Sequence, residues 1–279
     1  MPELPEVETV VRTLRPRLLG AAISAVWTSN KGLRLARPID RAALARLSVA
    51  ARIAAVRRKG KYILIDLDRG QAGVLIHLGM SGRLRLQAGS EPRAPHTHVV
   101  WSLAGGDELR FVDPRRFGWV AASRDVDALP ELAGLGPDAL VELDVSRLRA
   151  LLAASRAPLK SFLLDQKRIA GLGNIYVCEA LFRARLHPGT PARRATGRAA
   201  ALLRAIRATL RVALSNREPA CATSSTPRAE GARTRQPCWY TAASANRVAL
   251  VARPCAGRWI ADARPSSVLA ASVARRRDH

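Results

Sequence analysis

Residues 1–9 read MPELPEVET, and the prolines and glutamates of this stretch lie at the start of a helical pattern. Pro5 suits the first turn of a helix, and aliphatic residues recur at helical spacing from Val7 to Leu14. Pro16 and Gly20 then favour an end to the helix. The sequence therefore predicts that the chain opens with a single helix.

The same stretch carries a candidate nucleophile and a candidate acid. We expect Met1 to be trimmed, because methionine before a small residue ordinarily is, and Pro2 then has a free secondary amine. An α-amino group has a lower pKa than lysine, so such an amine can attack a sugar anomeric carbon, displace a base and leave a covalent iminium. Glu3 can serve as the acid if burial raises its pKa. On chemistry alone the simpler interpretation is a frayed start whose glutamates favour a helix N-terminus.

Further along the chain the hydrophobic pattern changes its period. Short segments rich in β-branched or aliphatic residues predict strands at 22–29, 52–58, 62–68, 73–78, 97–103 and 108–112. Strands at this spacing indicate a sandwich or a barrel. Helical patterns return in residues 146–155, 158–166, 175–185 and 197–214. The sequence predicts an α+β protein with three parts: a β-sandwich domain with a leading helix (1–130), a helical domain (131–215), and an irregular tail (216–279).

The chain is strongly basic, with 46 Lys and Arg against 22 Asp and Glu and a net charge of +24. Such an excess of positive charge favours binding to a polyanion, because neutralising the phosphates of a nucleic acid releases condensed counterions. Ribosomal and membrane-surface proteins share the signature, and a GC-rich genome also favours arginine. The charge therefore favours a nucleic-acid partner without identifying it.

No stretch approaches the roughly twenty apolar residues that span a bilayer. The first residues are acidic where a signal peptide would be basic and then apolar. We therefore expect a cytoplasmic monomer with no membrane partner.

Two turns combine basic and aromatic side chains in a way that suits a site. Residues 57–62, RRKGKY, lie between two predicted strands as a tight hairpin would, although an exposed basic turn is the ordinary interpretation. Residues 113–118, DPRRFG, put two arginines beside an aromatic ring, as a surface loop also would.

Two further segments are built around glycines. Residues 77–82, HLGMSG, follow an apolar strand, and taken alone they predict that Met80 is a core residue. Residues 165–176, DQKRIAGLGNIY, place Asn174 at a predicted helix N-cap, where exposed amides can bind phosphate. An ordinary capped helix would read the same.

In content and order, these motifs resemble the formamidopyrimidine-DNA glycosylase family, from Met1 to about Leu214. The resemblance implies a helix–two-turn–helix domain after the β-sandwich. It also implies a bifunctional DNA glycosylase and AP lyase of base excision repair, acting on damaged double-stranded DNA at the bacterial nucleoid. Its catalytic residues would be Pro2 as the nucleophile that forms a Schiff base, Glu3 as the general acid, and Lys61 for the elimination steps.

The resemblance also implies a set of DNA contacts. Met80 would fill the gap left by a flipped base, and an unbranched polarisable side chain suits that task. Arg115 would read the orphaned cytosine, Arg116 would contact phosphate, and Phe117 would wedge into the stack.

Phosphate contacts are implied for Arg156, Lys160 and Asn174. His96 matches a further DNA-contact position, and a structural histidine is the alternative.

The resemblance stops after the last predicted helix. The family ordinarily continues with a Gly-Gly-Thr segment that covers the flipped base, and ends in a zinc finger of two Cys-x-x-Cys pairs. Here residues 216–221 read NREPAC, and Cys221, Cys238 and Cys255 form no such pair. Zinc ligands generally come as close pairs, so the sequence predicts no structural zinc and no other cofactor. The tail composition predicts disorder, and a shifted reading frame in a GC-rich gene would explain it.

The leading functional hypothesis is the excision of oxidised purines, such as 8-oxoguanine and formamidopyrimidines, followed by β,δ-elimination. The abnormal tail would impair this activity. One alternative is an oxidised-pyrimidine glycosylase of the same superfamily, whose members tend to begin Pro-Glu-Gly-Pro-Glu, so that Leu4 favours the purine branch. The other is a DNA-binding remnant without catalysis.

Overall fold

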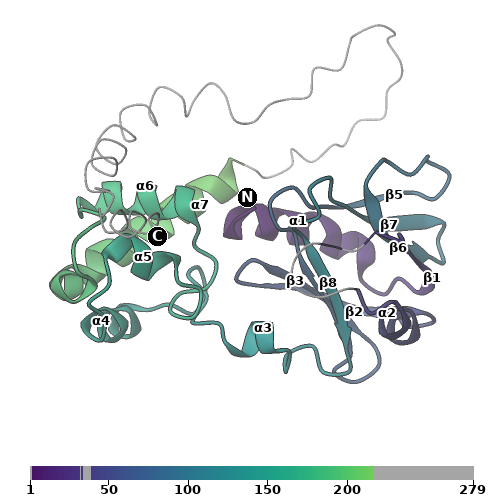
Figure 1. Cartoon of the computed structure of the whole chain (residues 1–279), viewed down its shortest axis with the longest axis horizontal. Coiled ribbons are helices and arrows are strands. Elements are labelled where there is room, and N and C mark those ends of the chain that lie inside the picture. The colour runs from purple at the N-terminus through teal and green to yellow at the C-terminus, as the bar shows by residue number, and fades with distance from the viewer. Residues whose placement is uncertain (1, 32, 34–38, 217–279) are drawn as a thin grey trace, which may run out of the picture. The chain divides into compact units, whose positions relative to one another are not determined.

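The computed structural model describes residues 2–31, 33 and 39–216 (Figure 1). Helix α1 (Leu4–Leu18), strand β1 (Ile23–Thr28) and helix α2 (Arg41–Ser48) come first. Seven strands follow: β2 (Ile53–Lys59), β3 (Tyr62–Leu67), β4 (Gly73–His77), β5 (Arg83–Ala88), β6 (Thr97–Leu103), β7 (Asp107–Val112) and β8 (Trp119–Ser123). The remaining elements are helical: α3 (Pro130–Ala133), α4 (Val145–Ala153), α5 (Leu159–Leu164), α6 (Asn174–Ala184), the 3-10 helix η1 (Ala192–Arg198) and α7 (Ala199–Ser215).

The strands form two antiparallel four-stranded sheets, ordered β1-β6-β7-β5 and β2-β3-β4-β8. Side chains of both sheets share one apolar core, with Ile63 and Ile65 from one sheet and Trp101 and Phe111 from the other. The second sheet also buries its opposite face, where Leu64 and Leu75 pack with Leu132 of α3. Burial on both faces accounts for the nearly continuous apolar sequence of β3 and β4. The predicted sandwich is confirmed.

Helix α1 adds its apolar stripe to the sandwich core through Val7, Val11 and Leu18. The helix runs through Pro16 to Leu18, beyond the predicted end. Pro16 removes one backbone donor in the last turn, and the full burial of Leu18 favours continuation of the helix across it.

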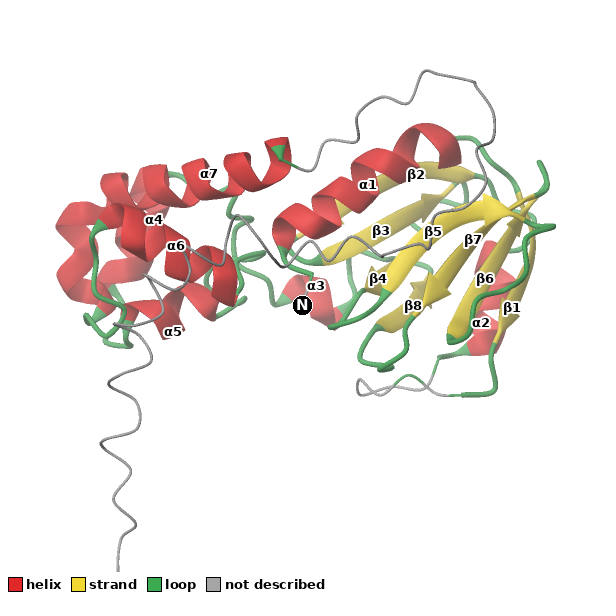
Figure 2. Ribbon diagram, turned by 90° about the horizontal axis from the view of Figure 1, so that it is seen from above, coloured by secondary structure: helices red, strands yellow, loops and turns green. Residues whose placement is uncertain are grey.

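The helical region has an apolar core of its own. Helices α4 to α7 contribute to it residues such as Leu148, Phe162 and Ile206. In Figure 2 these red helices form a group apart from the yellow strands. The α+β class predicted from the sequence is therefore confirmed, whereas the predicted disorder of the tail falls on residues 217–279, outside the described part. Among the described helices, none has the length and apolar character needed to span a membrane.

Candidate functional site

The β2–β3 hairpin brings one lysine into the protein interior. Lys59 pairs with Tyr62, so Gly60 and Lys61 form the two-residue turn, in which Gly60 has a φ of +58°. A two-residue hairpin turn needs such left-handed backbone, which glycine adopts at little cost. The Lys61 side chain is buried, with 8% exposure. This lysine therefore does not belong to an exposed basic turn, which was the ordinary interpretation of the sequence.

Glu3 lies at the junction of two helices that are far apart in sequence. Its backbone N–H donates to Glu6 Oε2 at 2.7 Å, at the start of α1. Its carboxylate accepts from the backbone N–H groups of Ile175 (3.1 Å) and Tyr176 (3.5 Å), at the start of α6. A carboxylate is well placed at a helix N-terminus, because unpaired amides and the helix dipole both favour negative charge.

This arrangement corrects the predicted cap of α6. The N-cap is Gly173, and Asn174 is the first helical residue, exposed to solvent. The capping group is the carboxylate of Glu3, so no local side chain is needed for that function. A Cβ on Gly173 would lie 2.1 Å from Glu3 Cδ, which leaves room only for glycine.

Gly171 fixes the start of α1 in a similar way. Its carbonyl accepts from the Leu4 N–H at 3.2 Å, and its φ is +99°. A Cβ there would lie 2.5 Å from Leu4 Cδ1. The side-chain amide of Gln166 holds the loop, since it accepts from Gly171 N–H and donates to the Leu172 carbonyl. Gly171 and Gly173 therefore both allow the start of the chain to approach this loop closely.

Burial moves two site groups toward their neutral forms. It raises the pKa of Glu3, against the opposing effects of the Ile175 amide and of Lys61. It lowers the pKa of Lys61, against the attraction of the Glu3 and Glu6 carboxylates. Glu6 also accepts a 2.6 Å hydrogen bond from the Tyr176 hydroxyl. A carboxyl that can hold a proton beside an amine that can lose one suits acid–base chemistry.

Two loops at the edge of the sandwich are joined through Asp113, which is fully buried. One carboxylate oxygen of Asp113 accepts from the Ser81 hydroxyl, and the other accepts from Gly118 N–H at 2.6 Å. A Cβ on Gly79 would lie 2.3 Å from the Phe117 carbonyl, so the loops are in direct contact. Asp113 was not among the predicted site residues, although it opens the quoted DPRRFG motif.

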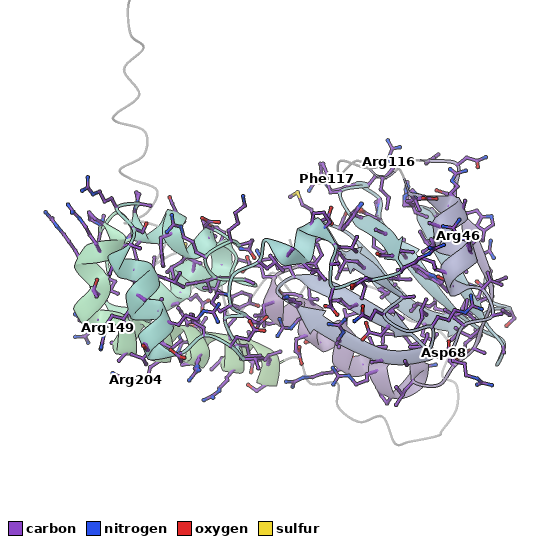
Figure 3. The ribbon with its side chains drawn as sticks, turned by 90° about the horizontal axis from the view of Figure 1, so that it is seen from below. Arg46, Asp68, Arg116, Phe117, Arg149 and Arg204 are labelled. Carbon is purple, nitrogen blue, oxygen red and sulfur yellow. The ribbon has the colours of Figure 1, made fainter. Side chains whose placement is uncertain are left out.

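These loops present Met80 and the Arg115–Phe117 segment. Met80 is 45% exposed, so the prediction from the residues alone that it is a core residue is wrong. It lies in a turn in which Gly79 packs against the neighbouring loop, and its own side chain is left outside. The Arg115 guanidinium lies 4.9 Å from the centre of the Phe117 ring, and Arg116 has a φ of +57°. Figure 3 shows Arg116 and Phe117 at the outer edge of the sandwich.

The two histidines of the Pro-His-Thr-His segment differ in their surroundings. His98 is buried, and its ring nitrogens lie 2.9 Å from Ser29 Oγ and 3.1 Å from the Asp113 carbonyl oxygen. His96 is exposed, with a φ of +65°. The structural histidine of this pair is therefore His98.

The candidate phosphate contacts come from the helical region. Lys160 lies in the first turn of α5 and is half-buried, Asn174 opens α6, and these two helices pack against each other. Arg156 lies in the connection before α5 and is exposed.

Two domain models match the chain, and both describe one family. The N-terminal domain of formamidopyrimidine-DNA glycosylase matches residues 1–120, and the H2TH domain of the same enzyme matches residues 135–225. The formamidopyrimidine-DNA glycosylase of Moorella thermoacetica is 48% identical over 195 residues, which is 69% of this chain and 70% of that protein.

The chain belongs to the formamidopyrimidine-DNA glycosylase family. The enzyme of Xanthomonas campestris pv. campestris is 47% identical over 189 residues, covering 67% of this chain and 68% of its own.

Solved structures show the same likeness to the formamidopyrimidine-DNA glycosylases. The MutM (Fpg) protein of Thermus thermophilus is 40% identical, with a TM-score of 0.67 over 77% of this chain and 76% of its own. The Lactococcus lactis enzyme, bound to DNA containing an AP site, is 29% identical, with a TM-score of 0.69 over 77% of this chain and 83% of its own.

The described residues offer no donor set for the zinc that the family resemblance implies. Within the described residues no group of three His, Cys, Asp or Glu side chains could hold a metal ion, and Cys178 is a free thiol. Cys221, Cys238 and Cys255 lie outside the described residues, and their wide spacing does not fit a structural zinc. The prediction of no zinc remains a prediction.

Proposed function

We propose that this chain is a bifunctional DNA glycosylase and AP lyase that removes oxidised purines from duplex DNA. The observation that carries the proposal is the burial of Glu3 and Lys61 in one electrostatically coupled group, with both pKa values displaced toward the neutral form. Displaced pKa values in one small region are typical of catalytic acids and bases.

In the first step, the amine of Pro2, freed by loss of Met1, attacks C1′ of the damaged nucleotide. The bond between C1′ and the base nitrogen breaks, its electron pair leaves with the base, and the base takes up the proton that the Pro2 nitrogen gives up. Glu3 donates its proton to the ring oxygen, so the sugar opens to an iminium on the Pro2 nitrogen. The buried, helix-capping position of Glu3 supports this role, because it keeps the carboxyl fixed while burial favours its protonated form.

The elimination steps then cut the strand. Removal of a proton from C2′ expels the 3′-phosphate, and loss of a second proton, from C4′, expels the 5′-phosphate. Lys61 serves these steps. Its lowered pKa supports the role, because a neutral amine can accept a proton.

The remaining site residues are assigned to DNA. Met80 fills the space of the flipped base, Arg115 reads the orphaned cytosine, and Phe117 wedges beside it. The exposure of Met80 and the rigid Asp113-centred packing of its loop support these roles. Apolar side chains that insert between bases kink the duplex, and a loop fixed by packing can hold such a side chain in the space of a flipped base.

Further residues would complete the binding of DNA. Phosphate contacts are assigned to Arg116, Arg156, Lys160 and Asn174, and a DNA contact without a stated target is assigned to His96. The net charge of +24 supports a polyanionic partner, and the Lactococcus lactis structure contains AP-site DNA.

On this proposal residues 1–130 carry the chemistry and residues 131–215 hold the DNA. The tail, residues 216–279, contributes neither a zinc site nor a cover for the flipped base, so we expect weak excision and stronger lyase activity on preformed abasic sites.

Borohydride trapping tests the proposal, since only a competent amine leaves a covalent protein–DNA adduct. The expected result is an adduct whose peptide map places DNA on Pro2, and its loss when Met1 is retained. DNA binding without an adduct would instead favour the non-catalytic remnant, and faster release of an oxidised pyrimidine than of 8-oxoguanine would favour the pyrimidine enzyme.

A further inference from the structure

A buried charged triad lies beside the hairpin turn. Arg58 donates to Glu8 Oε2 at 2.7 Å and forms a two-pronged pair with Asp138, whose second contact measures 3.2 Å. The side chains of Arg58 and Asp138 are only 4% and 6% exposed. The three residues come from β2, from α1 and from the segment between α3 and α4.

Two members of the triad bind the backbone N–H and the carbonyl of Gly60, the residue that precedes Lys61. Gly60 N–H donates to Asp138 Oδ2 at 3.1 Å, and the Gly60 carbonyl accepts from Arg58 Nη1 at 3.0 Å. A two-residue turn has no other interior ladder bond to fix it, so these contacts set the direction in which Lys61 leaves the turn.

Asp138 is itself tied to the loop that holds the start of the chain. Ala139 N–H donates to the Ala170 carbonyl, and Ala170 N–H donates to the Pro137 carbonyl, each at 3.0 Å. The next residue, Gly171, accepts from Leu4 N–H. One short path of hydrogen bonds therefore joins the turn of Lys61 to the segment of Pro2 and Glu3.

Stability alone is a weak reason for such a buried ion pair, because desolvation offsets most of its attraction. We propose that Asp138 is a positioning residue: with Arg58, it holds the Gly60 peptide so that the Lys61 amine faces the substrate sugar. This inference rests on the proposed function of Lys61. A displacement of about 1 Å can lower a rate by roughly 100-fold, so the hold has a measurable consequence.

Asp138→Asn tests the idea with little change in shape. An amide keeps one acceptor oxygen, which can take the place of Oδ2 beside Gly60 N–H and Arg58 Nη1. Its NH2 group then faces two other donors, Arg58 Nη2 and Leu140 N–H, so the two-pronged pair that holds the Gly60 peptide is lost. We expect the single-turnover rate of strand cleavage at an abasic site to fall about 10- to 100-fold. Borohydride trapping on Pro2 and the Kd for abasic DNA should change less than about threefold, because the nucleophile and the phosphate contacts lie elsewhere.

Asp66→Asn is the matched control. Asp66 pairs with Arg57, the neighbour of Arg58 on β2, at 2.6 Å, and it does not contact Gly60. It should leave strand cleavage unchanged. Equal losses in both variants, or wild-type cleavage by Asp138→Asn, would overturn the proposal.

If Asp138→Asn does not fold, the pair of substitutions Arg58→Met and Asp138→Leu replaces the ion pair by apolar side chains of similar size, which buried pairs often tolerate. This double variant also lacks both hydrogen bonds to the Gly60 backbone, so the same selective loss of strand cleavage is expected. Normal cleavage by a folded double variant would refute the idea.

A measurement independent of activity separates this inference from the proposed function. Acylation of Lys61 by acetic anhydride, followed by mass spectrometry, reports the exposure of its amine. We expect Asp138→Asn to increase the labelling of Lys61 at least about threefold over Asp66→Asn. Increased labelling in a protein that forms no adduct with DNA would uphold the positioning and reject the enzyme, and unchanged labelling would reject the positioning whatever the activity.

Discussion

Substitution of Gly173 by alanine should separate the acid step from the rest of the reaction. The added Cβ would lie 2.1 Å from Glu3 Cδ and 2.4 Å from each carboxylate oxygen. Ordinary contact begins at 3.4 Å, so the carboxyl must move by about 1.3 Å (3.4 Å less 2.1 Å). Its hydrogen bonds to Ile175 and Tyr176 already measure 3.1 and 3.5 Å, and neither survives such a shift.

Two consequences follow from that displacement. Removing the partner of a buried hydrogen-bonding group costs about 1–3 kcal/mol, so the loss of both hydrogen bonds should lower the unfolding free energy by roughly 2–6 kcal/mol. An acid displaced by about 1 Å loses roughly 100-fold in rate, so excision of 8-oxoguanine should fall by that factor. Cleavage of a preformed abasic site should fall far less, because the base has already left.

The assay compares both substrates in one duplex sequence under single-turnover conditions, with urea unfolding alongside. Gly197→Ala is the control, because a Cβ at Gly197 meets nothing within 4 Å. Excision by Gly173→Ala within threefold of wild type would refute the assignment of Glu3 as a helix-held acid, provided that Gly197→Ala behaves normally.

Three further predictions concern DNA reading, pH and metal. Arg115→Ala should reduce discrimination for cytosine opposite the lesion by about 1–3 kcal/mol. Arg116→Ala should instead weaken the binding of all duplexes alike and lower the salt dependence of binding by about one counterion. Identical behaviour of the two variants in binding titrations would contradict this division. Burial lowers the pKa of His77 from 6.5 to about 4. The contribution of His77 to the free energy of unfolding is therefore complete above pH 6.5 and declines by roughly 3 kcal/mol as the pH falls to about 4. His77→Asn should flatten that decline in urea titrations, and an unchanged decline would reject this assignment to His77. Metal analysis should find less than one zinc per chain, and chelation that releases zinc and abolishes DNA binding would show that the tail cysteines form a site.

The sequence pattern predicts correctly those elements that are determined by residues close together in the sequence. The hairpin at Gly60–Lys61 follows from a glycine between two apolar runs, and α1 follows from Pro5 and the spacing of valines. Strand β5 was missed because its inward leucines alternate with arginines. Strand β8 was missed because its alanines have little strand preference, and its partner β4 supplies the reason for it.

The candidate site shows the same limit at longer range. The carboxylate that caps α6 belongs to Glu3, so the residues near 174 alone predict a cap at Asn174, whereas the N-cap is Gly173. Arg58 and Asp138 are separated by 80 residues, and nothing in either neighbourhood indicates the other. Motifs indicate the candidate residues, and packing between distant segments determines how their side chains are held.

The hydrogen bonds between the Glu3 carboxylate and the N-terminus of α6 have a consequence during translation of the chain. A ribosome synthesises Pro2, Glu3 and Lys61 well before it reaches Ile175 and Tyr176. The backbone N–H groups of these two later residues donate to the Glu3 carboxylate. A nascent or truncated β-domain therefore has its amine but lacks a fixed proton donor. On the proposed mechanism, base release therefore begins only when the helical region has folded against the start of the chain, so an unfinished polypeptide cannot excise bases.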